Sequence, residues 1–207
     1  MITEKQLEFL RVFLPNIFRE ITFSDIKKET KESSNNKLQK ALIVLIKENI
    51  IKVRKIGKTN LYSLNIENNR TFTYLALIEY EIKSKPILLN ALYDVQHAVM
   101  KKTCLFSLVI FGSYAKEKAT KKSDLDIAIF IENEKIRKNI IPYIETMKRK
   151  HVIEIDYHII TEKEFFKMLK MDEENIGKDI FRNYIVFYNP VCFYELLKKG
   201  WKNGFKN

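Results

Sequence analysis

The chain has 207 residues, enough for one large domain or two small ones, and 46% of them are hydrophobic, which can supply a core for each. A net charge of +11 favours polyanionic partners such as nucleotides or nucleic acid, and the scarcity of glycine and proline argues against a low-complexity chain. No apolar run approaches the ~18 residues of a membrane helix and no signal peptide opens the chain, so we expect a cytoplasmic protein without membrane contact.

Residues 1 to about 66 have the pattern of three helices followed by a β-hairpin. Ser24 is the predicted N-cap of a short second helix over residues 25–31. Two alternating segments, 51–56 and 61–65, predict a hairpin around Gly57-Lys58-Thr59-Asn60. The third helix has an apolar stripe at the spacing of one helix face, formed by Leu38, Ala41, Leu42, Leu45 and Ile46.

This order resembles a winged helix-turn-helix domain over residues 1–66. The resemblance implies that the third helix enters the major groove of duplex DNA and that the hairpin contacts the phosphates. The candidate DNA-binding residues can donate to phosphates or base edges; they are Asn35, Asn36, Lys37 and Lys40 on the helix, and Lys55 and Lys58 on the hairpin. Winged helices also dock proteins or form homodimers, so both of these alternatives stay open.

The second domain is predicted over residues 71–207 and begins with a helical stretch, 71–102. An apolar run of strand length, 105–111, follows and ends at Gly112-Ser113. The two cysteines, Cys104 and Cys192, have neither metal-ligand nor disulfide spacing, and we expect them to be small buried side chains.

Three carboxylates are predicted to meet on one face of a sheet. Period-2 alternation in a strand over 124–131 puts Asp124 and Asp126 on the same side. A further strand over 152–160 puts Asp156 on one face with Glu154 and His158. Carboxylates gathered in one patch repel each other unless a cation lies among them, and Mg²⁺ prefers hard oxygen ligands. The pattern therefore predicts a magnesium site.

The motif Gly112-Ser113, ten residues, then Asp124-Leu125-Asp126 resembles the signature of minimal nucleotidyltransferases in the DNA polymerase β-like superfamily. The resemblance covers about residues 85–160, the predicted catalytic core. It implies that Gly112 and Ser113 hold a triphosphate, and that Asp124 and Asp126 bind magnesium. Asp156 would help to bind metal and would serve as, or orient, the base. Two Mg²⁺ ions and ATP or another nucleoside triphosphate are implied as well.

The chain departs from this family's pattern just after the motif. Relatives usually carry a glycine shortly after the Gly-Ser-x-Ala segment, where this chain has Tyr114-Ala115-Lys116-Glu117. The Glu117 carboxylate would repel a triphosphate, whereas Lys116, our remaining candidate for nucleotide binding, can offset it. Residues 161–207 are predicted to be a helical segment that closes the domain, with Phe181–Tyr188 similar to the closing segment of the family.

The expected fold is therefore mixed α and β (α+β): a winged helix domain, then a nucleotidyltransferase fold with a short mixed sheet and helices. Two functions of different classes follow. One is a magnesium-dependent nucleotidyltransferase (EC 2.7.7 type) that moves AMP from ATP to a hydroxyl of a protein or small molecule, as antitoxins of toxin–antitoxin pairs do. The other is a DNA-binding regulator or antitoxin whose nucleotidyltransferase domain only binds nucleotide or a partner protein.

Overall fold

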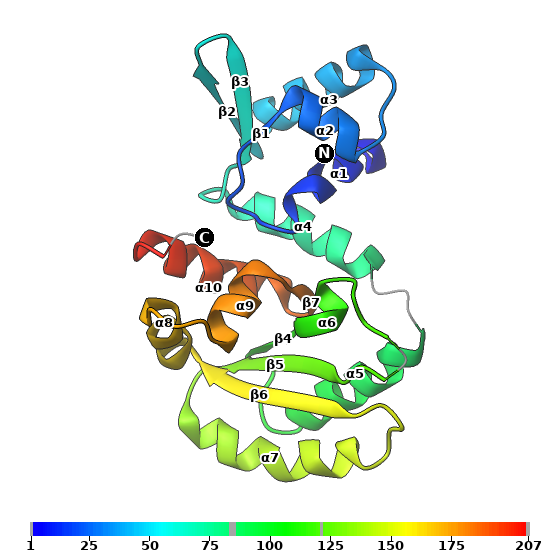
Figure 1. Ribbon diagram of the computed structural model, residues 1–207, viewed down its shortest axis with the longest axis vertical. Helices are drawn as coiled ribbons and strands as arrows, with labels where there is room; N and C mark the ends of the chain where they lie inside the picture. Colours follow the sequence, from blue (N-terminus) through cyan, green and yellow to red (C-terminus); the bar gives the residue numbers. More distant parts are fainter. Residues whose placement is uncertain (1, 83–85, 121, 206–207) are drawn as a thin grey trace. The chain divides into compact units, whose positions relative to one another are not determined.

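The computed structural model describes residues 2–82, 86–120 and 122–205 (Figure 1). The chain divides into two compact units, Met1–Ile78 and Glu79–Asn207. Each unit combines helices with a small sheet, which confirms the predicted mixed α and β fold. Within the described ranges, no helix has the length and apolar character needed to cross a membrane.

The first unit packs short helices against an antiparallel sheet with the strand order β1-β3-β2. Leu38, Leu42 and Leu45 are buried, as the apolar stripe predicts. The order of elements is the one expected for a winged helix, which itself stays a prediction. The elements are α1 (Glu4–Leu10), the 3-10 helix η1 (Arg11–Phe13), β1 (Ile21–Thr22), α2 (Phe23–Glu29), α3 (Asn35–Lys47), β2 (Ile51–Ile56), β3 (Thr59–Leu64) and the first part of α4 (Asn69–Ile82).

Two boundaries of this unit differ from the prediction. The N-cap of α2 is Thr22 rather than Ser24, because Thr22 and Asp25 form a capping box: the Thr22 hydroxyl accepts from the Asp25 amide and the Asp25 carboxylate accepts from the Thr22 amide. The hairpin loop is only two residues long, with Gly57 at φ +57°, so β3 begins at Thr59.

The second unit contains a four-stranded sheet with the order β6-β5-β4-β7 (Figure 1). Strands β5 and β6 are parallel, and the other two pairs are antiparallel. The elements after the end of α4 are α5 (Pro86–Met100), β4 (Phe106–Ile110), α6 (Gly112–Ala115), β5 (Leu125–Ile131), α7 (Glu134–Lys148), β6 (Ile155–Thr161), α8 (Glu162–Lys170), α9 (Ile176–Arg182), β7 (Ile185–Tyr188) and α10 (Pro190–Lys202).

The two faces of this sheet are covered differently. Helices α5 and α7 pack on one face, where Leu125, Ile127 and Ile129 of β5 are fully buried. On the opposite face, the ring of Phe130 packs edge-on against Phe165 of α8, with 5.1 Å between centroids, and lies 5.3 Å from Phe193 of α10. Since side chains alternate along a strand, Asp126 shares this second face, near the other end of β5.

Three expectations for the second unit are corrected. The strand predicted from residue 152 begins at Ile155, because only from there does the chain pair with β5, and Val152 is fully exposed. The closing segment 161–207 is not wholly helical: β7 pairs with β4, and Val186 and Phe187 are buried. The cysteines are exposed rather than buried, since they lie in the turn before β4 and in the first turn of α10.

Candidate active site

The chain turns at Gly112 and Ser113, the first residues of α6 after β4, and closes onto an aspartate of the neighbouring strand. Gly112 has φ +65°, a conformation that favours glycine. A Cβ added there would lie 2.0 Å from Oδ2 and 2.7 Å from Cγ of Asp126, so no larger residue fits without displacing the carboxylate. The Ser113 backbone amide donates a hydrogen bond to the same carboxylate. Gly112 and Ser113 therefore hold Asp126 in place.

Asp126 and Asp156 lie directly opposite each other on adjacent parallel strands. Their Cα atoms are register partners in the β5–β6 pairing. Asp126 is half-buried, whereas the side chain of Asp156 is 60% exposed. Asp124 lies in the loop just before β5 and is exposed. Two of the three predicted carboxylates thus lie side by side on adjacent strands. The third, Asp124, lies two residues before Asp126.

The neighbouring carboxylates affect the pKa of Asp126. Burial raises the pKa of the Asp126 carboxyl above its usual range, and the negative charges of Asp156 and then Asp124 raise it further. The Ser113 amide and His158 act in the opposite direction on this pKa. His158 lies on the same strand as Asp156, with 3.5 Å between its Nε2 and Oδ2 of Asp156.

The donor set suits a hard divalent cation. Carboxylate oxygens are the ligands that Mg²⁺ prefers, and the mutual repulsion seen at Asp126 is what a cation between the carboxylates would relieve. The side chains do not yet converge as ligands, because the described residues contain no group of three or more His, Cys, Asp or Glu in a metal-binding arrangement. The chemistry of the residues fits the ion, and Asp126 and Asp156 are the two that lie beside each other on adjacent strands.

Lys116, the predicted nucleotide contact, is engaged by another helix. Its ammonium forms an ion pair with Asp179 of α9, at 2.8 Å from Oδ1 and 2.9 Å from Oδ2. The side-chain amide of Asn183 also donates to Asp179, at 3.1 Å. The lysine is the C-cap of α6, the short helix that begins at Gly112, so this ion pair links α6 to α9.

Glu117 occupies a position that favours glycine. Its φ is +56°, and it ends α6 in a Schellman motif. The Glu117 amide donates to the carbonyl of Tyr114 at 3.3 Å, and the Lys118 amide donates to the carbonyl of Ser113 at 2.9 Å. A glycine would adopt this conformation without strain, whereas a glutamate adopts it at a cost of about 1 kcal/mol.

Residues 99–180 match the model of the nucleotidyltransferase domain family. The matched range runs from the end of α5 into α9 and includes the Gly112-Ser113 turn and all three aspartates. Comparison with curated proteins and with solved structures gave no match. The family match supports a general nucleotidyl transfer activity for this part of the chain.

Two contacts of the candidate site were not predicted as parts of it. Asp179 is 63 residues from Lys116, and no local pattern connects them. His158 had a signal in the sequence, since alternation along the strand places it on the face of Asp156, and its contact with that carboxylate follows from the same alternation. Glu154 precedes β6 and is exposed.

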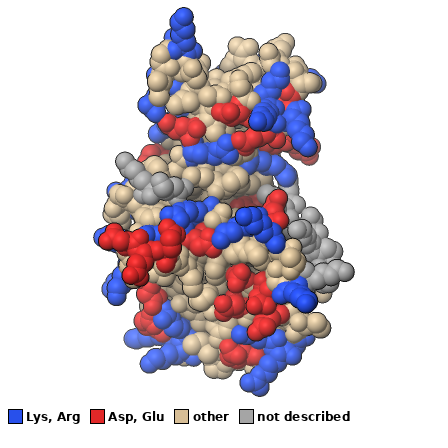
Figure 2. Space-filling model, in the orientation of Figure 1, with Lys and Arg blue, Asp and Glu red and all other residues tan. Residues whose placement is uncertain are grey.

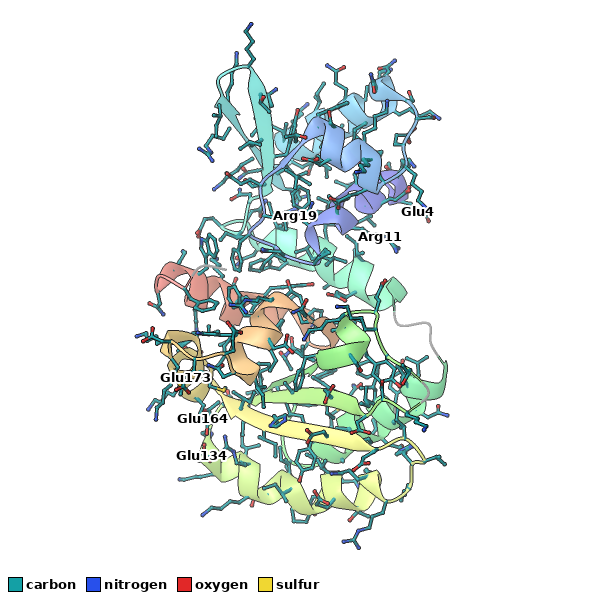
Figure 3. All side chains as sticks on the ribbon, in the orientation of Figure 1. Glu4, Arg11, Arg19, Glu134, Glu164 and Glu173 are labelled. Atoms are coloured by element: carbon teal, nitrogen blue, oxygen red, sulfur yellow. The ribbon has the colours of Figure 1, made fainter. Side chains whose placement is uncertain are left out.

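The predicted DNA-binding residues lie outside the matched domain, on the first unit. All six are exposed: Asn35, Asn36, Lys37 and Lys40 on the first turns of α3, and Lys55 and Lys58 on the β2–β3 hairpin. Figure 2 shows Lys and Arg side chains projecting at the tip of this hairpin. By contrast, Arg54 of β2 pairs with Glu20, and Arg19 pairs with Glu29. Figure 3 labels Arg19 in the first unit. The hairpin tip and the start of α3 therefore present basic surface.

Proposed function

We propose that the second unit transfers AMP from ATP to a hydroxyl group of a protein or small-molecule acceptor, with magnesium. One observation carries the proposal: the Gly112-Ser113 turn closes onto Asp126, which has Asp156 as its register partner, and all of them lie within the matched nucleotidyltransferase range. A half-buried carboxylate held beside a second, exposed one combines a fixed ligand with a group that stays accessible to an incoming hydroxyl.

Each residue has a role in this proposal. Asp126 and Asp156, together with Asp124, would hold the ion. Its positive charge would offset the negative charge of the phosphates. The Ser113 hydroxyl, next to Gly112, donates to a phosphate oxygen. Asp156 is the most accessible of the paired carboxylates and takes the proton of the acceptor hydroxyl. Rate enhancement then comes chiefly from positioning and from charge stabilisation, as in other phosphoryl transfers.

Calorimetry of ATP binding, with Mg²⁺ and with EDTA, tests this proposal. The carboxylates repel a triphosphate when no cation is present, so we expect ATP to bind only with the divalent ion. Asp126→Asn should weaken binding in Mg²⁺, while Glu132→Gln, an exposed carboxylate just after β5, should not. Equal affinity in EDTA would contradict the proposal.

The exposed basic residues of the first unit favour a second candidate function, DNA binding by residues 1–66, with residues 71–207 acting as the nucleotidyltransferase domain. Contacts to roughly four to six phosphates would give a log–log salt slope of about −4 to −5. Replacing Lys40, Lys55 and Lys58 together by alanine should flatten the slope. The matched control replaces three other exposed lysines of the unit, Lys28, Lys31 and Lys47. A full-length protein without affinity for duplex DNA at low salt would contradict this function.

A further inference from the structure

The outer edge of β6 borders an open groove with a volume of about 550 Å³. In the described part of the chain β6 pairs only with β5, so its other edge meets no strand. Residues 157–160 form the floor of the groove, and helices α7 and α8 provide its walls. The wall residues are Arg137 and Ile141 of α7, and Glu164, Lys167 and Met168 of α8.

The groove is largely apolar and open to solvent. Ile141 is 37% exposed and Met171, just after α8, is 44% exposed, although both are large hydrophobic side chains. Consecutive residues of β6, 157–160, line it. Because neighbouring side chains of a strand point to opposite faces, Ile159 and Ile160 lie on opposite sides of the strand edge. An unpaired strand edge between two helices fits an extended chain, because an added strand satisfies the edge amides and carbonyls while placing side chains on both sides.

The charges of the groove select the partner. Arg137 forms ion pairs with Glu164 and with Glu134, the latter at 3.2 Å, and Figure 3 shows both glutamates beside each other. Glu164, the carboxylate among the lining residues of the groove, is thereby paired. Lys167 is exposed, and no described residue forms an ion pair with it. The unmatched cation is complementary to an acidic segment.

The groove is continuous with the candidate active site. His158 forms part of the floor, and its Nε2 lies 3.5 Å from Oδ2 of Asp156. A chain that follows the edge of β6 toward its N-terminal end therefore arrives at Asp156, the carboxylate that remains accessible. The groove and the candidate active site therefore lie next to each other along β6.

We propose that this groove docks the acceptor: an extended, acidic segment of a partner protein that adds to β6 as a strand. Its aliphatic side chains lie between α7 and α8, a carboxylate pairs with Lys167, and a hydroxyl-bearing residue lies next to Asp156. The inference rests on the proposed function. In the transfer step the hydroxyl oxygen bonds to the α-phosphorus while the bond from that phosphorus to the bridging oxygen breaks. Pyrophosphate leaves with the electron pair, and Asp156 takes the proton.

Strand-length peptides in which valine alternates with glutamate test the docking site on the full-length protein. One version carries a tyrosine at its N-terminus and the other carries it at its C-terminus, so that both directions of the added strand are tested. Fluorescence anisotropy measures binding, and label from ATP marked at the α-phosphorus measures transfer to the tyrosine. We expect binding by at least one version. A lysine-for-glutamate peptide and a backbone N-methylated peptide should bind at least about tenfold more weakly, because they lose the charge match or the edge hydrogen bonds.

Paired variants locate the binding. Lys167→Glu and Ile141→Asn should each weaken peptide binding about tenfold. Their controls have the same chemistry outside the groove: Lys163→Glu on α8, and Val191→Asn on α10, where Val191 is 39% exposed. All four positions are exposed, so the variants should keep the fold, which their unfolding temperatures check.

The inference is overturned if neither acidic peptide binds, if groove and control variants bind alike, or if the N-methylated peptide binds as well as the unmodified one. Transfer of AMP to a small hydroxyl compound without any peptide binding would contradict the docking site alone. Peptide binding by a protein that does not bind ATP would contradict the proposed function instead.

Discussion

Phe130 and Asp126 project from the same face of β5, four residues apart, yet the surroundings of the two side chains are opposite. Phe130 is covered by aromatic rings of α8 and α10 and is 7% exposed. Asp126 is half-buried against a glycine, beside an exposed carboxylate whose charge repels it. We call the part of β5 around Phe130 its closed end and the part around Asp126 its open end. Apolar burial at the closed end stabilises the strand, so the open end can carry charged groups that oppose folding. Substitutions at each end can break or sharpen this contrast.

At the closed end we expect the largest change in stability. Phe130→Ala removes a ring packed between Phe165 and Phe193 and should lower the free energy of unfolding by about 3–5 kcal/mol. Ile141→Ala, at an exposed apolar position, should change it by less than about 1 kcal/mol. Chemical denaturation of both variants measures the difference. Comparable losses of stability in the two variants would mean that Phe130 does not lie in a closed core.

At the open end, the ion pair between Lys116 and Asp179 should restrain triphosphate binding. Asp179→Asn releases the ammonium while keeping the bulk of the side chain, so ATP affinity in Mg²⁺ should rise about threefold to tenfold. Glu174→Gln removes a different ion pair, with Arg182, and serves as the control. If calorimetry shows no change for Asp179→Asn, Lys116 does not contact the triphosphate.

Glu117→Gly should relieve the left-handed backbone at the end of α6. We expect a gain in stability of about 1 kcal/mol and a rise in ATP affinity of up to about fivefold, since a repelling charge is lost as well. Glu117→Gln separates the two causes, because it removes the charge and keeps the strain. Lys31→Gly is the matched control, since Lys31 ends α2 at φ 53° and should gain stability without any change in ATP binding. An affinity that stays at the parental value in both Glu117 variants would show that this side chain has no influence on the triphosphate.

The smallest expected effect is the change in melting temperature when the charge of Asp126 is removed. Burial and the charge of Asp156 raise the pKa of Asp126 in the folded state, so the ionised carboxylate opposes folding above that pKa, and the penalty disappears as the pH falls below the unfolded value. Asp126→Asn should therefore raise the melting temperature at pH 7 by about 1–2 °C. The gain should vanish near pH 3. A variant that melts below the parent protein at pH 7 would contradict the repulsion.

The sequence predicted those features that depend on local alternation. The strand positions of Asp126 and Asp156, the buried residues on the other side of β5 and the stripe of α3 follow from periods of two and of about 3.6 residues. Asp124 was predicted to begin the strand but lies in the loop just before it. Features set by tertiary pairing were not predictable in this way. The pairing of β7 with β4, the position of β6 at the sheet edge and the contact between Lys116 and Asp179 join segments far apart in the chain. The left-handed conformation of Glu117 was not predicted, because glutamate carries no signal for it.

The most direct test of the proposed site is transfer of label from ATP marked at the α-phosphorus, in Mg²⁺, to hydroxyl acceptors. Soluble protein from the source cells and an aminoglycoside serve as the two acceptor pools. The parent protein should label one of them and release pyrophosphate, Glu132→Gln should match it, and Asp126→Asn should fall by at least about 1000-fold while remaining folded. Transfer by Asp126→Asn at the parental rate, or no transfer by the parent protein to either pool, would contradict the account.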